Sequence, residues 1–255
     1  TPADKRLTNA HRGGLTTRMP RVPFPFPDPE CIVVGSIGDA AALRESTTAS
    51  LAGQCDIAEI RLDILHREFR EKGTALWEHL LPFPLLFTAR CHAEGSPFDL
   101  DLSTRTAMLE AVLPDASLID IEVRQASSMA GIISEIVAEG VPWVASYHDF
   151  EQLPSSQKLA THAEIAREAG ASAFKAAARL RTMDDLTALA HFQMSEKGIP
   201  LATMGMGVLA PVSRLLCAQA GSVLNYGFIG ETATAPGQWS ARQLRESIRS
   251  LSPFR

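Results

Sequence analysis

Residues 172–178 read Ser172-Ala173-Phe174-Lys175-Ala176-Ala177-Ala178, a run of small and apolar side chains with a single lysine near its middle. A short run without other charges is typical of a strand that is buried on both faces. An unpaired ammonium is so unfavourable in such a place that the group tends to lose its proton. A neutral amine in a sheltered pocket attacks carbonyl carbons, so the run indicates a Schiff-base nucleophile. The alternatives are that Lys175 reaches solvent from the strand end, or pairs with a structural carboxylate.

Similar apolar, β-branched runs recur along the chain. They occupy residues 31–37, 57–62, 85–90, 118–123, 142–147, 172–177, 199–204 and 223–228. Segments with helical spacing lie between them, at residues 40–52, 127–138, 157–169, 183–197, 212–220 and 241–251. This alternation predicts an α/β fold with a parallel sheet, and eight strands predict a single (β/α)8 TIM barrel. A doubly wound open sheet is the alternative, but the loop Gly35-Ser36-Ile37-Gly38 lacks the third glycine of a dinucleotide-binding turn.

The first 29 residues differ from the rest in their proline content. A regular helix or a central strand is excluded there by Pro20, Pro23, Pro25, Pro27 and Pro29. We expect a Pro-rich N-terminal arm over residues 1–29, extended along the domain or partly disordered. The catalytic barrel would then occupy residues 30–255.

The composition argues against several classes of function. The 255-residue chain is 45% hydrophobic and 21% charged, with a formal net charge of −5. An acidic chain without a Lys/Arg cluster indicates no nucleic-acid partner, and no apolar run is long enough to cross a membrane. The four cysteines are widely scattered, which suits reduced thiols better than disulfides or zinc. Because the N-terminus also lacks a signal-peptide core, we expect a cytoplasmic protein.

Polar residues gather at the C-terminal ends of the predicted strands, where the loops of a barrel converge over one mouth. Glu59, Arg61 and Asp63 alternate along the second strand and therefore share one face. The other polar residues at strand ends are Ser36, Arg90, Glu94, Asp120, Glu122, His148, Lys175, Arg214, Thr234 and Gln238. A lysine, a histidine and three arginines around one mouth predict a pocket for a small anion that carries a carbonyl group. Structural charge layers inside the barrel are the expected role of Asp63, Asp120 and Glu122.

In this order, the motifs closely resemble those of type I 3-dehydroquinate dehydratase, the Schiff-base dehydroquinase of the shikimate pathway. The motifs are Glu59-Ile60-Arg61-Leu62-Asp63, Arg90 with Glu94-Gly95, Ser146-Tyr147-His148-Asp149-Phe150, Phe174-Lys175, Met204-Gly205-Met206, Ser213-Arg214, Gly221-Ser222 and Ala235-Pro236-Gly237-Gln238. The likeness runs from residue 31 to the C-terminus. One motif alone would be weak, but their order along successive strands is specific.

The resemblance implies a lyase that removes water from 3-dehydroquinate to give 3-dehydroshikimate in aromatic amino acid biosynthesis, with no cofactor and no metal. It implies that Lys175 forms the Schiff base, that His148 is the general acid and base, and that Glu94 orients His148. Arg214 would hold the substrate carboxylate. The other implied substrate-binding residues are Ser36, Glu59, Arg61, Arg90, Thr234 and Gln238.

For Lys175 to attack, its pKa must fall from about 10.4 towards 7–8. Burial, His148 and the arginines are the expected sources of this shift. The resemblance also implies a homodimer. The loop 230–238 is our candidate for a lid, because it carries two of the implied ligand residues among small neighbours.

The chain departs from the family pattern in three places. Thr234 stands where a serine is common, which keeps the hydroxyl and adds a methyl group. Arg179 stands where an uncharged residue is more usual, and would either face the mouth or reach solvent. The Pro-rich arm replaces the β-hairpin that commonly closes the bottom of the barrel.

Three other interpretations remain open from the sequence. One is another Schiff-base barrel enzyme, such as a class I aldolase or transaldolase. The second is a non-catalytic relative that binds quinate-like ligands, although such a protein needs neither Lys175 nor His148. The third is a metal site made of His92, Glu94 and His148, for which the sequence offers no clear fourth ligand.

Overall fold

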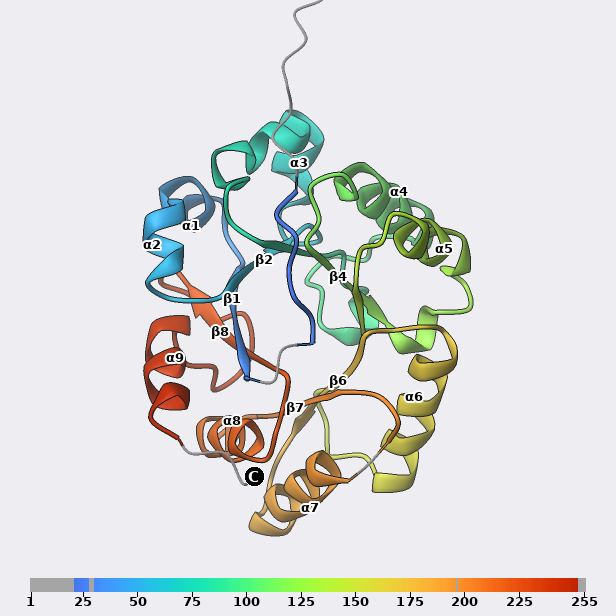
Figure 1. The fold of residues 1–255 in the computed structure, drawn as a ribbon, viewed down its shortest axis with the longest axis vertical. Helices are drawn as coiled ribbons and strands as arrows, with labels where there is room; N and C mark the ends of the chain where they lie inside the picture. Colours follow the sequence, from blue (N-terminus) through green and yellow to red (C-terminus); the bar gives the residue numbers. More distant parts are fainter. Residues whose placement is uncertain (1–20, 28–29, 196, 252–255) are drawn as a thin grey trace, which may run out of the picture.

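The chain folds into an eight-stranded parallel barrel with helices around it, as predicted (Figure 1). The structure, a computed structural model, describes residues 21–27, 30–195 and 197–251. The strands are β1 (Ile32–Ile37), β2 (Ile57–Arg61), β3 (Leu85–Thr88), β4 (Leu118–Glu122), β5 (Trp143–Asp149), β6 (Ala173–Arg179), β7 (Leu201–Met206) and β8 (Leu224–Ile229). Hydrogen-bonded neighbours follow the order β7-β6-β5-β4-β3-β2-β1-β8. Each predicted strand is therefore present, with ends that differ by up to two residues.

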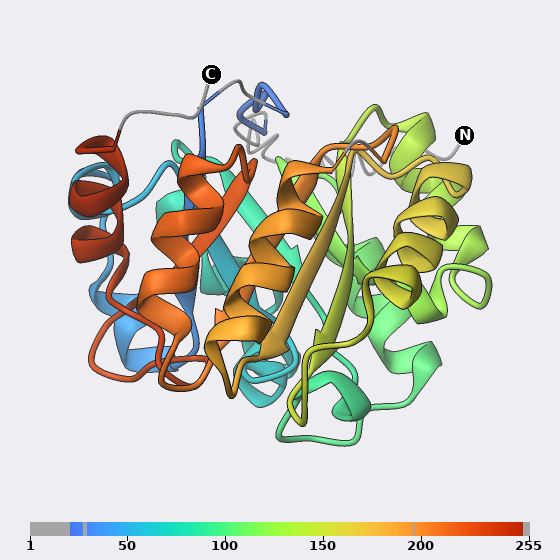
Figure 2. The ribbon, with the colours of Figure 1, turned by 90° about the horizontal axis from the view of Figure 1, so that it is seen from below.

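The helices cover the outside of the barrel (Figure 2). They are α1 (Ala40–Glu45), α2 (Thr48–Ala52), α3 (His66–Lys72), α4 (Leu102–Val112), α5 (Ala130–Ala138), α6 (Ser156–Glu168), α7 (Met183–Met194), α8 (Ala210–Gln219) and α9 (Ala241–Arg249). Short 3₁₀ turns are η1 (Gly73–Leu76), η2 (Glu78–Leu80), η3 (His92–Glu94) and η4 (Val123–Gln125). Within the described part of the chain, no helix has the length and apolar character needed to cross a bilayer.

Two expectations about the helices were wrong or incomplete. The predicted helix 40–52 is two helices, because Ser46 is extended and the Thr47 side chain caps the second one by accepting from Ser50 N. The helix α3 was not predicted, and neither was α4. The buried face of α4 includes Arg105 beside apolar residues, and a charge at that position breaks the apolar pattern of the sequence.

The strands β7 and β8 close the barrel without a shared ladder. Val223 N donates to Leu201 O at 2.9 Å near the start of the two strands. Further along, the guanidinium of Arg214 lies between them. Its Nη1 donates to the backbone oxygen of Tyr226 on β8 at 2.7 Å and lies 3.4 Å from the sulfur of Met204 on β7. We call this region the β7–β8 seam.

The barrel interior changes character along its axis. Near the start of the strands it is apolar, with Ile32, Ile57, Leu118 and Leu224 in one buried cluster. The next inward positions are polar and include Glu59, Asp120 and Lys175, all of them buried. Because all strands run the same way, these polar groups lie together towards the C-terminal end of the barrel.

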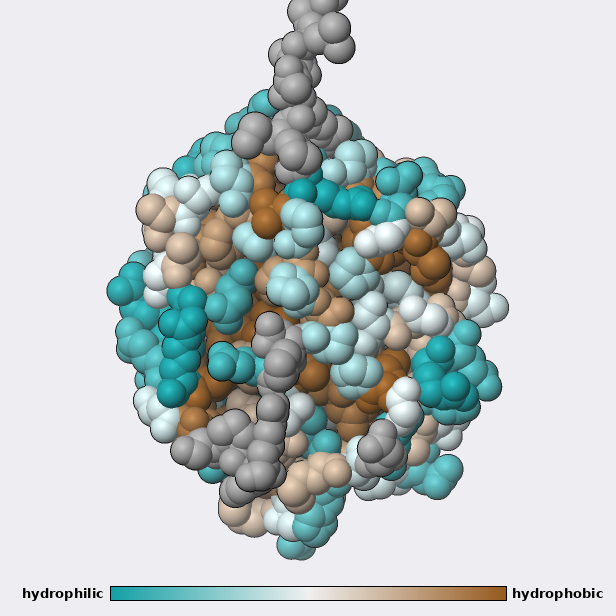
Figure 3. All heavy atoms as spheres, viewed as in Figure 1, coloured by the Kyte–Doolittle hydropathy of each residue, from teal (hydrophilic) through white to brown (hydrophobic). Residues whose placement is uncertain are grey.

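Residues 21–27 form an extended segment across the opposite, N-terminal end of the barrel (Figures 1 and 2). Phe24 and Phe26 are half-buried against the interior cluster, while Pro23, Pro25 and Pro27 are exposed. Ser117 Oγ donates to Val22 O at 2.8 Å and fixes the segment. Figure 3 views this end and shows hydrophobic residues near the middle of the face. The prolines at 20 and 29 lie outside the described residues, so the division at residues 29 and 30 stays a prediction.

We expect the two phenylalanines to act as the closure of this end. Replacing both, Phe24→Ala with Phe26→Ala, should lower the free energy of unfolding by about 2–4 kcal/mol, because half-buried aromatic contacts are lost. The matched control, Pro23→Ala with Pro25→Ala, changes exposed residues and should cost less than about 1 kcal/mol. Urea denaturation measures both, and equal midpoints for the two variants would contradict the closure.

Candidate active site

All ten residues predicted to form the site line one cavity at the C-terminal end of the strands. The cavity has a volume of about 60 Å³. The ten are Ser36, Glu59, Arg61, Arg90, Glu94, His148, Lys175, Arg214, Thr234 and Gln238. They come from strands, from the turns and loops that follow them and, for Arg214, from α8, which is why no local stretch of sequence contains the site.

Lys175 lies at the floor of this cavity and is 4% exposed. Its Nζ donates to Asp120 Oδ2 at 2.9 Å. The same nitrogen lies 4.0 Å from the centroid of the Tyr226 ring, close enough for a cation–π contact. The alternative that Lys175 snorkels to solvent is therefore wrong, and the lysine does have a carboxylate partner in Asp120.

Burial lowers the pKa of Lys175 below the ordinary lysine value; Asp120 opposes this shift and Arg90 adds to it. The expectation that His148 helps to lower the pKa of Lys175 was wrong. Burial and nearby cations, Arg90 among them, hold the pKa of His148 well below the ordinary imidazole value. A neutral imidazole supplies no positive charge to the lysine, so desolvation and Arg90 act in its place.

Asp120 is held as a carboxylate by two cations. Arg90 Nη2 lies 2.9 Å from its Oδ1, and Ser146 Oγ donates to the same oxygen at 2.6 Å. Burial alone would raise the pKa of Asp120, but Arg90 and Lys175 lower it to about 2. A ladder of buried charges continues from Arg90 to Glu122 at 3.1 Å and on to Arg105 at 3.0 Å. The expected structural layer exists, and Asp120 connects it to the lysine.

His148 is held by Glu94 from the 3₁₀ turn after β3. Glu94 Oε2 accepts from the backbone N–H of His148 at 2.8 Å and lies 3.0 Å from its Nδ1. Strand register sets Ser146 beside Lys175 and His148 beside Ala177. The imidazole is thus one inward position nearer the mouth than the lysine, where it faces whatever binds there.

Two further carboxylates lie on the inward face of β2 and just after it. Asp63 accepts two bonds from Arg61, at 2.9 and 2.7 Å, in a bidentate pair. Glu59 accepts from the hydroxyl of Ser36 and, at 2.7 Å, from that of Thr88. Arg61 and Arg90 therefore both have acidic partners inside the protein.

Arg214 differs from these two arginines. It is 1% exposed, and among the described residues no carboxylate lies within ion-pair distance of it. Its Nε is buried without a hydrogen-bond partner in the same part of the chain. Burial lowers the pKa of Arg214 to about 10. An unneutralised buried guanidinium that lines a cavity attracts an anion.

The loop after β8 closes over the cavity through its own hydrogen bonds. Gln238 Oε1 accepts from the Thr234 N–H and from the Thr234 hydroxyl, both at 2.9 Å. Gly207 N donates to Pro236 O at 3.1 Å and ties the loop to the end of β7. Gly237, with φ of 74°, sits so close to Gly207 O that a side chain would clash.

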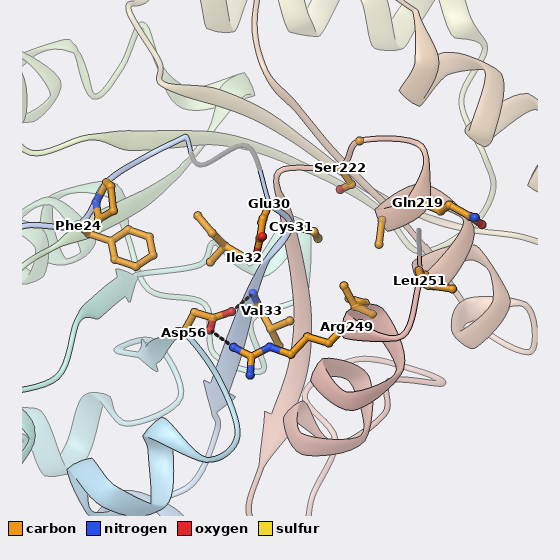
Figure 4. A pocket seen from close by; sticks show the side chains of 14 residues that line it. Phe24, Glu30, Cys31, Ile32, Val33, Asp56, Gln219, Ser222, Arg249 and Leu251 are labelled. Atoms are coloured by element: carbon orange, nitrogen blue, oxygen red, sulfur yellow. Dashed lines mark hydrogen bonds and ion pairs between the residues drawn. The ribbon is translucent and has the colours of Figure 1, made fainter. Parts of the chain in front are cut away.

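A larger cavity of about 470 Å³ lies at the other end of the barrel, where β1 and β8 begin (Figure 4). Neither Lys175 nor His148 lines it. Asp56, one of the two carboxylates that line it, is paired with Arg249 at 3.5 Å (Figure 4) and with Arg245 at 2.9 Å. Size alone would select this cavity, but the reactive groups lie in the smaller one.

The residues of the metal site considered from the sequence, which are His92, Glu94 and His148, do not converge on one point. His92 Nδ1 lies 2.9 Å from Ser96 O within its own loop, and His92 does not line the cavity. Both oxygens of Glu94 are already bonded. In residues 21–27, 30–195 and 197–251, no three His, Cys, Asp or Glu side chains are grouped to hold a metal ion.

The sequence interpretation missed two residues at this site. Tyr226 lies on the buried strand β8. An aromatic residue is ordinary in a buried strand, so the sequence gave no signal of its contact with Lys175. Arg124 was missed because it follows β4 in a 3₁₀ turn rather than at an inward strand position. Its Nε donates to Glu94 Oε1 at 2.9 Å.

Known proteins resemble this chain over most of its length. A family model described as Type I 3-dehydroquinase matches residues 31–254. A 3-dehydroquinate dehydratase of Bacillus subtilis is 33% identical over 208 residues, which are 77% of this chain and 81% of the relative. A catabolic 3-dehydroquinate dehydratase of Acinetobacter baylyi is 31% identical over 223 residues, 83% of this chain and 82% of the relative. The crystal structure of 3-dehydroquinate dehydratase from Geobacillus kaustophilus has a TM-score of 0.77 at 25% identity, covering 86% of this chain and 90% of that one.

The contact between Asp120 and Lys175 predicts how the lysine titrates. Asp120→Asn removes the group that raises the pKa of Lys175, so the lysine should lose its proton at lower pH than in the wild type. Competitive acetylation across a pH series, followed by mass spectrometry of the Lys175 peptide, measures this. Asp115→Asn is the matched control, because Asp115 is equally buried but accepts from Trp77, away from the cavity. A titration of Lys175 that is the same in both variants would contradict the prediction.

Proposed function

The chain belongs to the type I 3-dehydroquinase family, a family of hydro-lyases, and we propose that it dehydrates 3-dehydroquinate to 3-dehydroshikimate through a Schiff base on Lys175. One observation carries this proposal. A buried lysine with a lowered pKa, a neutral histidine oriented by a carboxylate, and an unneutralised arginine all line the same cavity.

In the first step the neutral amine of Lys175 attacks the C3 ketone of the substrate. The resulting carbinolamine expels its hydroxyl group, which takes a proton from solvent and leaves as water, and a protonated imine remains between Nζ and C3. Its positive charge replaces the ammonium beside Asp120 and Tyr226, so the carboxylate and the ring that stabilise Lys175 also stabilise the imine. The imine makes the proton on C2 acidic enough to be removed at neutral pH.

His148 then acts twice. With Nδ1–H donated to Glu94, its Nε2 is the basic nitrogen and takes the proton from C2. The electron pair moves through the enamine and expels the C1 hydroxyl, which receives the proton from His148 and leaves as water. Hydrolysis of the imine releases 3-dehydroshikimate and restores the amine. A positioned general base of this kind contributes roughly 10²–10⁴ in rate.

Arg214 is the proposed partner of the substrate carboxylate, supported by its burial without an acidic neighbour within the described residues. Gln238 and Thr234 would complete this end of the site. Hydroxyl groups of the substrate would contact the polar residues on the opposite wall, which are Ser36, Glu59, Arg61 and Arg90. A homodimer and a cytoplasmic location stay predictions, and sedimentation velocity tests the first.

Trapping the Schiff base tests the proposal directly. Incubation with 3-dehydroquinate and borohydride should attach the reduced adduct to the peptide that contains Lys175, as read by mass spectrometry. Lys175→Ala should abolish both the adduct and turnover, while Lys197→Ala, the matched lysine control, should retain both. His148→Ala should still form the adduct but lose turnover by at least about 10²-fold. An adduct on another lysine, or none in the wild type, would refute the mechanism; cleavage of sugar phosphates would instead indicate an aldolase.

Arg214 gives a second prediction. Arg214→Gln should lower kcat/KM for 3-dehydroquinate by about 10–100-fold, the loss of a charge-assisted hydrogen bond. The matched comparison uses the carboxamide analogue of the substrate. The wild type should prefer the carboxylate, whereas the variant should hardly distinguish the two compounds. Equal preference in both proteins would place the carboxylate elsewhere.

A further inference from the structure

We propose that Arg124 is a positioning residue of this reaction, one that holds Glu94 in its ionised form and thereby fixes His148 as the tautomer whose Nε2 is free to accept a proton. The inference rests on the proposed function for its kinetic consequence, but its structural content concerns Glu94 and His148 alone. Arg124 does not line the cavity, so its direct contact with the site is its hydrogen bond to Glu94.

The two oxygens of Glu94 have different tasks. Oε2 faces His148 and accepts from its backbone N–H while it contacts Nδ1 at 3.0 Å. Oε1 accepts from Arg124 Nε at 2.9 Å. Glu94 is itself 2% exposed. The carboxylate therefore bridges a buried imidazole on one side and a cation near the surface on the other.

The guanidinium of Arg124 is held in place although its side chain is 43% exposed. Its Cζ lies 5.1 Å from the centroid of the Tyr147 ring. Tyr147 is 1% exposed and stacks on His162 at 4.6 Å, so the surface beneath Arg124 is rigid. An exposed ion pair normally contributes little because its side chains must be ordered. Stacking on Tyr147 supplies that order here.

The charge on Glu94 decides which nitrogen of His148 carries the proton. An ionised carboxylate only accepts hydrogen bonds, so it requires Nδ1–H and leaves Nε2 bare. A protonated Glu94 donates to Nδ1, which moves the imidazole proton to Nε2 and removes the base. Burial raises the pKa of Glu94, against the opposing effects of Arg90 and Arg124. Loss of these arginines therefore shifts the pair towards a protonated Glu94 and the other tautomer of His148.

Arg90 cannot carry this task alone. Its guanidinium is already shared between Asp120 at 2.9 Å and Glu122 at 3.1 Å. Arg124 makes its ion pair with Glu94, so Glu94 receives its direct hydrogen bonds from Arg124 and His148. The other charged or titratable groups around Arg124, Glu94 and His148 are Arg61 on β2, Cys91 after β3, Glu122 on β4, Tyr147 on β5, Lys158 and His162 on α6, and Lys175 on β6.

Loss of Arg124 shifts the pKa of Glu94 and the pKa of His148 in the same direction. Arg124 lowers the pKa of Glu94 and the pKa of His148, so its removal raises both. Either change lets the pair take up a proton at higher pH and inactivates the base. The acidic limb of kcat must therefore move to higher pH. Lys175 does not contribute to this limb, because it is already bonded in the imine.

Arg124→Met removes the charge and keeps an apolar stem over Tyr147. We expect kcat on the acidic limb to fall about tenfold more than kcat on the plateau. Solvent screens the half-exposed ion pair between Arg124 and Glu94, which limits the size of this difference. Borohydride trapping on Lys175 should be unchanged. Arg124→Lys keeps the charge and should recover most of the loss. Arg181→Met is the matched control, since it removes the same charge from an exposed arginine after β6, whose only described bond comes from its backbone N–H.

A readout that does not depend on turnover separates this inference from the proposed function. In protein labelled with ¹⁵N-histidine, the His148 signals are assigned by their loss in His148→Asn. They should report Nδ1–H and bare Nε2 in the wild type and in Arg181→Met, and a mixed or protonated ring at mildly acidic pH in Arg124→Met. An identical tautomer and titration in all three proteins would overturn the role of Arg124, whether or not the wild type dehydrates 3-dehydroquinate. Failure of trapping in Arg124→Met alone would also overturn it, because the residue would then act before proton removal.

Discussion

The buried ion pair between Lys175 and Asp120 is the interaction on which the rest of the site depends. A lysine inside a closed barrel needs a negative partner, yet a partner that binds it too strongly keeps it protonated. Arg90 resolves this conflict by taking the other oxygen of Asp120, at 2.9 Å. Glu122 and Arg105 then follow because Arg90 itself must be neutralised. The buried charged side chains are thus connected by ion pairs, so a change in one of them alters the others.

Much of this arrangement could be predicted from the sequence, since a period of two along each strand fixes which side chains point inward. The alternation of apolar runs and helical segments predicted the barrel, and the resemblance to the family implied the ten residues that line one cavity. The strand period itself indicated only which side chains of one strand share a face. It could not give partners across the barrel, such as Asp120 with Lys175. It also fails where backbone geometry changes, as at Arg124 in a 3₁₀ turn. On α4 the pattern was broken by Arg105, whose burial makes sense only once Glu122 is seen beside it.

The two ends of the barrel have separate tasks. Phe24 and Phe26 cover the N-terminal end with apolar contacts, whereas the polar layer lies towards the C-terminal end. An apolar layer that includes Ile32 and Leu224 separates the two. Water that enters at one end is therefore kept from the ion pairs near the other, and the lowered pKa of Lys175 depends on that separation as much as on its neighbours.

Arg214 belongs both to the β7–β8 seam and to the lining of the cavity. An anion bound in the cavity would share this guanidinium with the bond from Nη1 to Tyr226 that joins the two edges of the sheet. Occupancy of the cavity and the mechanical continuity of the barrel wall are therefore linked through a single side chain.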